Sequence, residues 1–82
     1  MYLWTLIHEV STNMITEIGF AAGDIWKLLD QKERLELAEV MKQIPRSKEL
    51  ILMALGWLCR EGHIVIIEKD NKHFIELRKI KA

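Results

Sequence analysis

The stretch ALGWLCREGHIVIIEKD, residues 54–70, constrains the fold most, because a helical pattern ends in it at a glycine and a run of β-branched residues begins. Glycine is common just past the end of a helix, where the backbone turns left-handed, and Gly62 stands at that point. The following run leads to Asp70 and Asn71, a pair suited to the positive φ angles of a two-residue hairpin turn. This stretch therefore predicts a helix that leads directly into a β-hairpin.

The register of this hairpin follows from its turn. With Asp70 and Asn71 at the turn, Glu68 pairs with His73 and the ladder continues in step along both strands. Four apolar residues then share one face, which a slip of one residue would disrupt; they are Ile64, Ile66, Ile75 and Leu77. The opposite face carries Val65, Ile67 and Phe74. The first face is expected to cover a core, and the second is expected to be an outer apolar surface.

A helix is expected upstream, with Asn13 as its N-cap. Its apolar residues recur at alternating spacings of three and four, which form one face of an amphipathic helix; they are Ile15, Ile18, Ala22, Ile25 and Leu29. Gly19 and Gly23 lie one turn apart in it, although each glycine costs a helix about 0.5–1 kcal/mol relative to alanine. We therefore expect another backbone to pass close to these glycines, most simply within this domain.

Two further helices are separated by a tight turn. In LELAEVMKQI, where Leu35 fits a short strand, one helical face is formed by Leu37, Val40, Met41 and Ile44. Pro45 ends this helix because proline lacks the amide donor, and Ser47 is a suitable N-cap for a third helix, KELILMALGWLCRE. Two short helices joined in this way form a helix-turn-helix. With the hairpin added, the pattern predicts an α+β winged helix-turn-helix of three helices, a C-terminal β-hairpin wing and a short third strand near Leu35.

Length and composition indicate one domain with a surplus of apolar side chains. Counted with glycine and without tyrosine, 44 of the 82 residues are apolar (54%), above the roughly 45–50% of ordinary soluble domains. We divide the chain into an N-terminal arm, residues 1–12, and a winged-helix domain, residues 13–82. The single Cys59 fits a reducing compartment, there is no signal-peptide pattern, and no run reaches the ~18–20 apolar residues of a membrane span. A cytoplasmic protein without membrane contact is therefore expected.

The N-terminal arm begins MYLWTLIHEV and is compatible with two conformations. As a helix it has one apolar stripe, formed by Leu3, Leu6, Ile7 and Val10. As a strand it has an alternating face, formed by Tyr2, Trp4, Leu6 and Val10. The sequence does not decide between the two. In either form the arm is a candidate to cover apolar surface of its own subunit or of a neighbouring one.

The segments IGFAAGDIWKLL and ALGWLCREGHI resemble those of a family of small, stand-alone bacterial winged helix-turn-helix proteins that is described as a domain of unknown function. The resemblance covers about residues 15–80, and the Gly-Trp of the third helix followed by Arg-Glu-Gly is its most specific part. It implies the winged-helix fold and a homodimer. It implies no functional residues, so the function must be inferred from the side chains themselves.

The side of the third helix opposite its core face has few groups that can read bases. Base edges need matching polar side chains, and only Lys48 and Arg60, one at each end, qualify. Between them lie Leu52, Met53 and Gly56, which we call the apolar saddle, although a rotated helix would bury Leu52 or Met53 in the domain's own core. The sequence favours a protein-interaction module that forms a homodimer and can also receive a larger protein partner. The expected interface consists of Leu52, Met53, Gly56, Trp4, Val65, Ile67 and Phe74.

The charge distribution supports an alternative function, that of a DNA-binding transcriptional regulator. The chain has no net charge, but residues 1–41 carry three bases and seven acids, whereas residues 42–82 carry nine bases and five acids. The expected phosphate contacts are Arg46, Lys48, Arg60, Lys69 and Lys72, with Arg78, Lys79 and Lys81 extending the basic edge. Because the acidic half would repel a polyanion, nucleic acid is not the favoured partner.

The sequence shows no pattern for catalysis, metal binding or a cofactor. Its three histidines share no helical i, i+4 spacing with one another, and although Cys59 and His63 are four residues apart, Gly62 ends the helix between them. It has no glycine-rich phosphate loop, nucleophile motif or HExxH. Trp26 and Trp57 are interpreted as packing residues that join the first and third helices. We therefore expect a protein that is not an enzyme and uses no cofactor.

Overall fold

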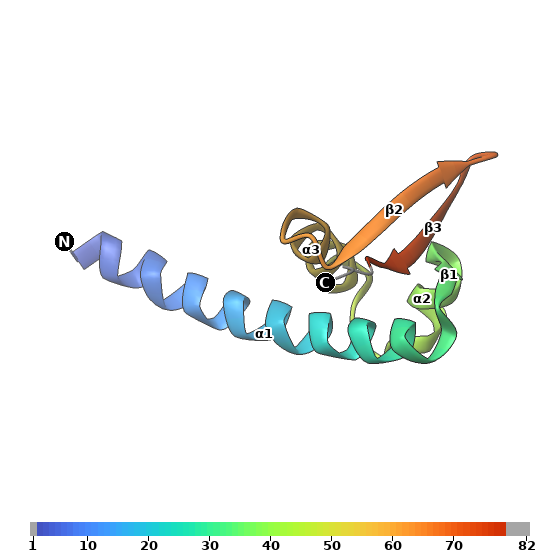
Figure 1. Cartoon of the computed structure of the whole chain (residues 1–82). Helices are drawn as coiled ribbons and strands as arrows, with labels where there is room; N and C mark the ends of the chain where they lie inside the picture. Colours follow the sequence, from blue (N-terminus) through green and yellow to red (C-terminus); the bar gives the residue numbers. More distant parts are fainter. Residues whose placement is uncertain (1, 79–82) are drawn as a thin grey trace, which may run out of the picture.

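The fold combines helices with a small antiparallel sheet (Figure 1). The computed structural model describes residues 2–78, and the side chains of residues 13–78. Over this range the elements are α1 (Tyr2–Lys32), β1 (Arg34–Glu36), α2 (Leu37–Gln43), α3 (Lys48–Arg60), β2 (Ile64–Lys69) and β3 (Lys72–Leu77). The sheet order is β1-β3-β2. The predicted α+β architecture, a winged helix-turn-helix with a C-terminal hairpin, is confirmed.

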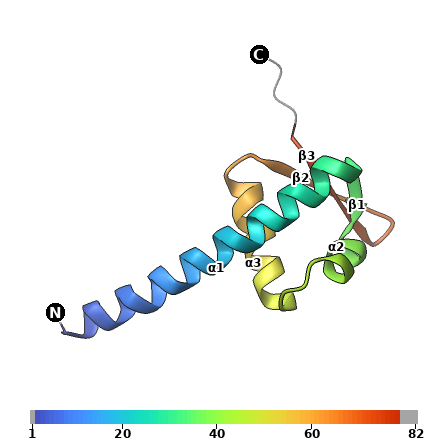
Figure 2. The same cartoon turned by 90° about the horizontal axis from the view of Figure 1, so that it is seen from below.

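Helix α1 is longer than the sequence pattern indicated. It begins at Tyr2 and runs for 31 residues, so Asn13 is not its N-cap and the expected arm is helical. No proline or glycine precedes Gly19, and a residue with good capping propensity does not start a helix when the residues before it are already helical. The expected boundary between residues 12 and 13 therefore lies inside one helix, whose first half extends beyond the rest of the molecule (Figure 2).

The wing forms as the sequence predicted. Its strands pair in the expected register, with Ile66 opposite Ile75 and Glu68 opposite His73. Asp70 and Asn71 adopt φ angles of 53° and 64°, which are the positive values that a two-residue hairpin turn requires. Gly62 closes α3 with a φ of 83°, and the chain passes from the helix into the wing through the short turn at residues 61–63.

The helix-turn-helix and the short strand also form as expected. Leu35 lies in β1 and pairs with Ile75 of β3, which attaches the segment before α2 to the wing. The hydroxyl oxygen of Ser47 accepts a hydrogen bond from the backbone N–H of Leu50 at 3.1 Å. Such a cap satisfies one of the unpaired amides in the first turn of a helix, so Ser47 determines where α3 begins.

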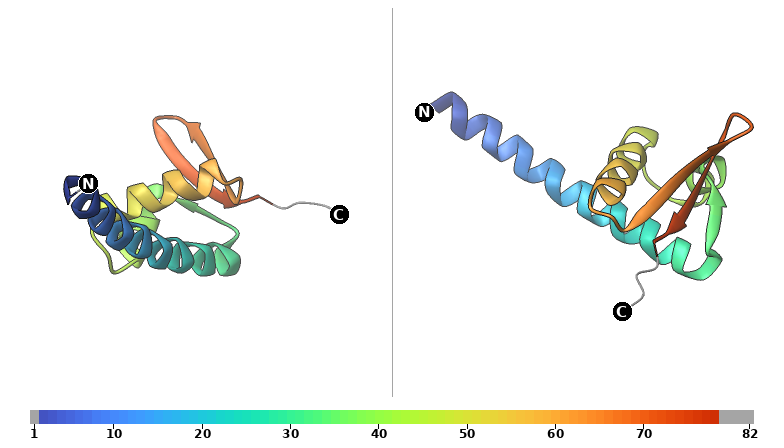
Figure 3. Two further views of the ribbon diagram at one scale, coloured as in Figure 1. Left: turned by 90° about the vertical axis from the view of Figure 1, so that its left-hand side faces the viewer. Right: turned by 45° about the horizontal axis from the view of Figure 1, so that its top comes forward.

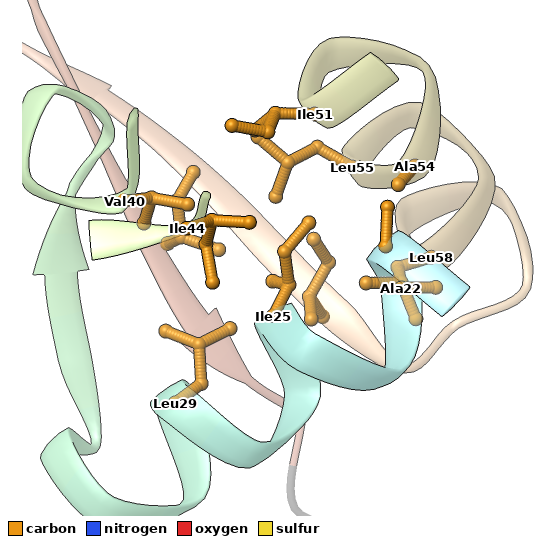
Figure 4. Packing of buried hydrophobic residues seen from close by; sticks show 12 residues of the cluster. Ala22, Ile25, Leu29, Val40, Ile44, Ile51, Ala54, Leu55 and Leu58 are labelled. Atoms are coloured by element: carbon orange, nitrogen blue, oxygen red, sulfur yellow. The ribbon is translucent and has the colours of Figure 1, made fainter. Parts of the chain in front are cut away.

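The core lies between α1, the helix-turn-helix and the inner face of the sheet. Helix α1 contributes Ala22, Ile25 and Leu29 to it, facing residues of α2 and α3 (Figure 4). The twelve core residues are Ala21, Ala22, Ile25, Leu29, Val40, Ile44, Ile51, Ala54, Leu55, Leu58, Ile64 and Ile75. Ile15, which was expected on the same face of α1, is 69% exposed, because α1 has already passed the edge of the core at that point.

Candidate functional site

The apolar saddle lies on the outer side of α3. Leu52 is 45% exposed and Met53 is 43% exposed, so neither side chain is buried in the domain's own core. Gly56 is exposed as well, and a Cβ added to it would meet nothing within 4 Å. The middle of α3 therefore presents apolar atoms to the outside, between Lys48 at its start and Arg60 at its end.

Beside the saddle, α3 and the wing enclose an apolar hollow of about 340 Å³. Its lining consists of Leu37, Leu52, Leu55, Gly56, Ile66, His73 and Ile75. A second hollow, of about 370 Å³, shares Leu37, Leu52 and His73 with the first and continues it toward the tip of the wing. We call the two together the wing groove, and it combines helix, sheet and helix-turn-helix residues in one apolar surface.

Ile66 is the groove residue that sequence reasoning placed wrongly. It lies on the inner face of the wing, as its alternation with Val65 predicted, but it is 39% exposed. The hairpin extends past the side of α3 (Figure 3). Ile75, directly opposite Ile66, lies on the central strand β3 and is 1% exposed, whereas Ile66 lies on the edge strand β2. Alternation identifies the face of a strand, but it does not tell whether the strand lies in the middle of the sheet or at its edge.

Three other predicted interface residues lie on the opposite side of the sheet. Val65 is exposed, whereas Ile67 and Phe74 are half-buried. The Arg34 guanidinium lies 5.3 Å from the centre of the Phe74 ring and forms a 2.9 Å ion pair with Glu76. This outer face is therefore partly covered by its own charged side chains, and the structure does not join it to the saddle. The side chain of Trp4 lies outside the described residues.

Arg46 is engaged within the chain and does not form part of an open basic surface. Its Nε lies 2.7 Å from Oδ2 of Asp24, to which it donates a hydrogen bond, and its Nη1 lies 4.0 Å from Oε1 of Glu17. Both acids belong to α1, so Arg46 attaches the turn before α3 to the first helix. The prediction that Arg46 contacts phosphate is not supported by this arrangement, because its charge is already paired.

Of the remaining predicted bases, the structure brings Lys48 and Lys72 to the same hollow, where both line the wing groove together with Glu36. Lys69 pairs with Lys72 across the hairpin and therefore lies at the tip of the wing. Arg60 lies twelve residues along α3 from Lys48, a separation of about 18 Å at 1.5 Å per residue. Lys48, Lys69 and Lys72 thus lie at the groove and the adjoining tip of the wing, whereas Arg60 lies apart from them at the other end of α3.

The two tryptophans differ from their expected role in packing. Trp26 is 43% exposed and Trp57 is 47% exposed, and both line a shallow hollow of about 230 Å³ with Gly19, Gly23 and His63. A Cβ added at either glycine would meet nothing within 4 Å. The expectation that another backbone of this domain passes close to them is therefore wrong, since α1 approaches the core through its two buried alanines.

His73 Nε2 lies 3.9 Å from Glu68 Oε2, the cross-strand pairing expected from the register. Within the part of the chain that the structure describes, no three histidine, cysteine or acidic side chains gather in a way that would hold a metal ion. Over the same residues, no helix combines the length and apolar character needed to cross a bilayer.

The helix-turn-helix, its C-terminal wing and an apolar third helix with a basic residue at each end define a winged-helix protein. The chain belongs to the winged helix-turn-helix domain family DUF2582, whose model matches residues 11–77. It is similar to the uncharacterized protein MJ1608 of Methanocaldococcus jannaschii, with 31% identity over 68 residues that cover 80% of this chain and 97% of the relative. That relative is archaeal, so the comparison does not support the bacterial origin implied by the resemblance.

Proposed function

We propose that the protein is a non-enzymatic winged-helix module that acts by protein association and forms a homodimer through the apolar saddle and the wing groove. The observation that carries this proposal is the exposure of Leu52 and Met53 in the middle of α3, beside a groove lined mainly by apolar side chains. Clustered apolar surface of this kind is typical of protein interaction sites. The same surface would also receive a larger protein partner.

The chemistry of α3 supports association over base reading. Specific contacts to base edges use hydrogen-bonding side chains, but the exposed middle of α3 offers leucine, methionine and glycine. The bases that remain accessible at the groove, Lys48 and Lys72, lie beside the acid Glu36. A chain with no net charge also lacks the long-range field that holds a polyanion.

Sedimentation velocity of the full chain and of Leu52→Glu tests this proposal. The wild type is expected to be a dimer, and Leu52→Glu a monomer with unchanged helical circular dichroism, because the dimer would have to remove two carboxylates from water. Trp57→Glu is a matched control, since Trp57 lies on the same helix with similar exposure but lines the other hollow. A monomeric wild type, or a Leu52→Glu variant that stays dimeric, contradicts the proposal.

One arrangement supports a second candidate function, DNA binding as a transcriptional regulator. Lys48 at the start of α3 and Lys72 on the wing line one hollow, and winged-helix domains commonly bind DNA, although fold alone does not establish function. A regulator of this kind would bind a duplex with an affinity that falls steeply as salt rises. Lys48→Glu combined with Lys72→Glu would abolish that binding, whereas Lys42→Glu on α2, away from the groove, would leave it unchanged. No salt-sensitive binding by the wild type would exclude this candidate.

A further inference from the structure

The backbone of α1 extends well beyond the core of its own domain. Among the residues whose side chains the structure describes, those of α1 that belong to the core or pack against it lie between Ile18 and Leu29, whereas Met14 is 36% exposed and Ile15 is 69% exposed. We call residues 2–14 the overhang. Its helical backbone leads away from the sheet and from α3 (Figures 1 and 2).

The sequence of the overhang continues the apolar pattern of the buried half of α1. Leu3, Ile7 and Val10 stand at spacings of four and three and lead to Met14 four residues later. Ile18 follows after another four residues and packs on the core. In a continuous α-helix such positions share one face. The sequence therefore continues one apolar stripe along the helix, and the core is described against its second part, from Ile18 onward.

We propose that the overhang of one copy docks into the wing groove of a second copy, reciprocally in both directions, as the contact that forms the homodimer. This inference rests on the proposed function, because it requires the wing groove to be an association surface. The overhang leads away from α2, α3 and the wing, whose residues line the groove of its own chain (Figure 2). A second copy is thus the source of the helix that fills the groove.

The apolar sequence pattern of the overhang matches the apolar lining of the groove. An amphipathic helix binds an apolar groove through residues spaced like those of the overhang, and the groove presents the apolar side chains of Leu52, Leu55 and Ile66 to it. The overhang is about 20 Å long at 1.5 Å per residue. The groove receives it along the stretch of α3 from Lys48 to Gly56, which is about 12 Å long, and continues along the wing.

Charge complementarity also favours this occupant. Residues 1–26 contain no lysine or arginine, and the overhang carries the acid Glu9. The mouth of the groove carries Lys48 and Lys72 against the single acid Glu36. Two overhangs packed on each other would bring like charges together, whereas an overhang in a groove brings opposite charges together.

Mixing two full-length variants tests the exchange. Ile7→Glu damages the overhang and keeps the groove, whereas Leu52→Glu damages the groove and keeps the overhang. Each variant alone is expected to associate at least tenfold more weakly than the wild type in sedimentation. An equimolar mixture is expected to associate more tightly than either variant alone, because one intact overhang then meets one intact groove. Thr5→Glu is the matched control, since it lies about 160° around the helix from residue 7, and it is expected to associate like the wild type.

The outcomes separate this inference from the proposed function. If Leu52→Glu remains dimeric, the proposed function itself is wrong. If Leu52→Glu dissociates but Ile7→Glu does not, or if the mixture associates no more tightly than the separate variants, the groove is an interface and the exchange of overhangs is wrong. Circular dichroism of each variant verifies that the helices are intact, so that a loss of association reports on the contact.

Discussion

Truncating Leu52 to alanine gives a quantitative test of the saddle, because its exposure sets the size of the effect. Fully burying a leucine side chain contributes about 1.5–3 kcal/mol, and 45% of Leu52 is still exposed in the single chain. Covering that fraction in a two-fold dimer, where each copy contributes one Leu52, amounts to about 1.4–2.7 kcal/mol. Leu52→Ala is therefore expected to raise the dimer dissociation constant roughly 10- to 100-fold.

Sedimentation equilibrium over a range of concentrations measures this change directly. Trp57→Ala is the control, because Trp57 is similarly exposed on α3 but lies outside the wing groove. It is expected to leave the dissociation constant unchanged. A change of less than about threefold for Leu52→Ala, or an equal change for Trp57→Ala, would show that the saddle is not covered in the dimer and would refute the reasoning.

Three further substitutions test the local structure. Gly62→Ala should lower the free energy of unfolding by roughly 1–2 kcal/mol, because the φ of 83° disfavours any Cβ. Urea unfolding measures this loss. An unchanged urea midpoint would contradict the left-handed conformation of residue 62 at the end of α3. Arg46→Ala should cost about 0.5–1 kcal/mol, a value discounted for the partial exposure of its ion pair with Asp24, and the loss should shrink in high salt; a salt-independent melting temperature difference would argue against pairing. Ile25→Ala should cost about 2–5 kcal/mol, since the side chain is fully buried, and a loss below 1 kcal/mol in urea would place it outside the core.

The parts of the fold that depend on neighbouring residues could be predicted from the sequence. The register of the wing follows from Asp70 and Asn71, because a two-residue turn sets every later pair. Ser47 and Gly62 determine the ends of α3 through local hydrogen bonding and backbone conformation. Leu35 was correctly placed in a short strand, although its partner Ile75 lies forty residues away.

The candidate site could be predicted less well than the fold, because the exposure and pairing of its residues depend on how far the neighbouring helices and strands extend. Trp26 and Trp57 were expected to pack between helices, yet both lie at the surface. Arg46 was counted among the free bases, but acids of α1 pair with it. A tryptophan can lie in a core or at the surface, and an arginine can be free or paired with an acid, so the residue type does not decide between the two. The partner that decides between them lies on an element distant in sequence, so no local pattern could reveal it.

The sequence by itself determined the elements, the helix-turn-helix and the hairpin, because spacing, caps and turn residues act over a few positions of the chain. Only the tertiary structure decided which apolar side chains remain exposed, among them Ile66 on the edge strand, Leu52 and Met53 in the saddle, and Ile15 on α1. The physical reason is that burial depends on the relative lengths and crossing of packed elements. A helix of 31 residues beside a helix of 13 must leave part of its length without a neighbour.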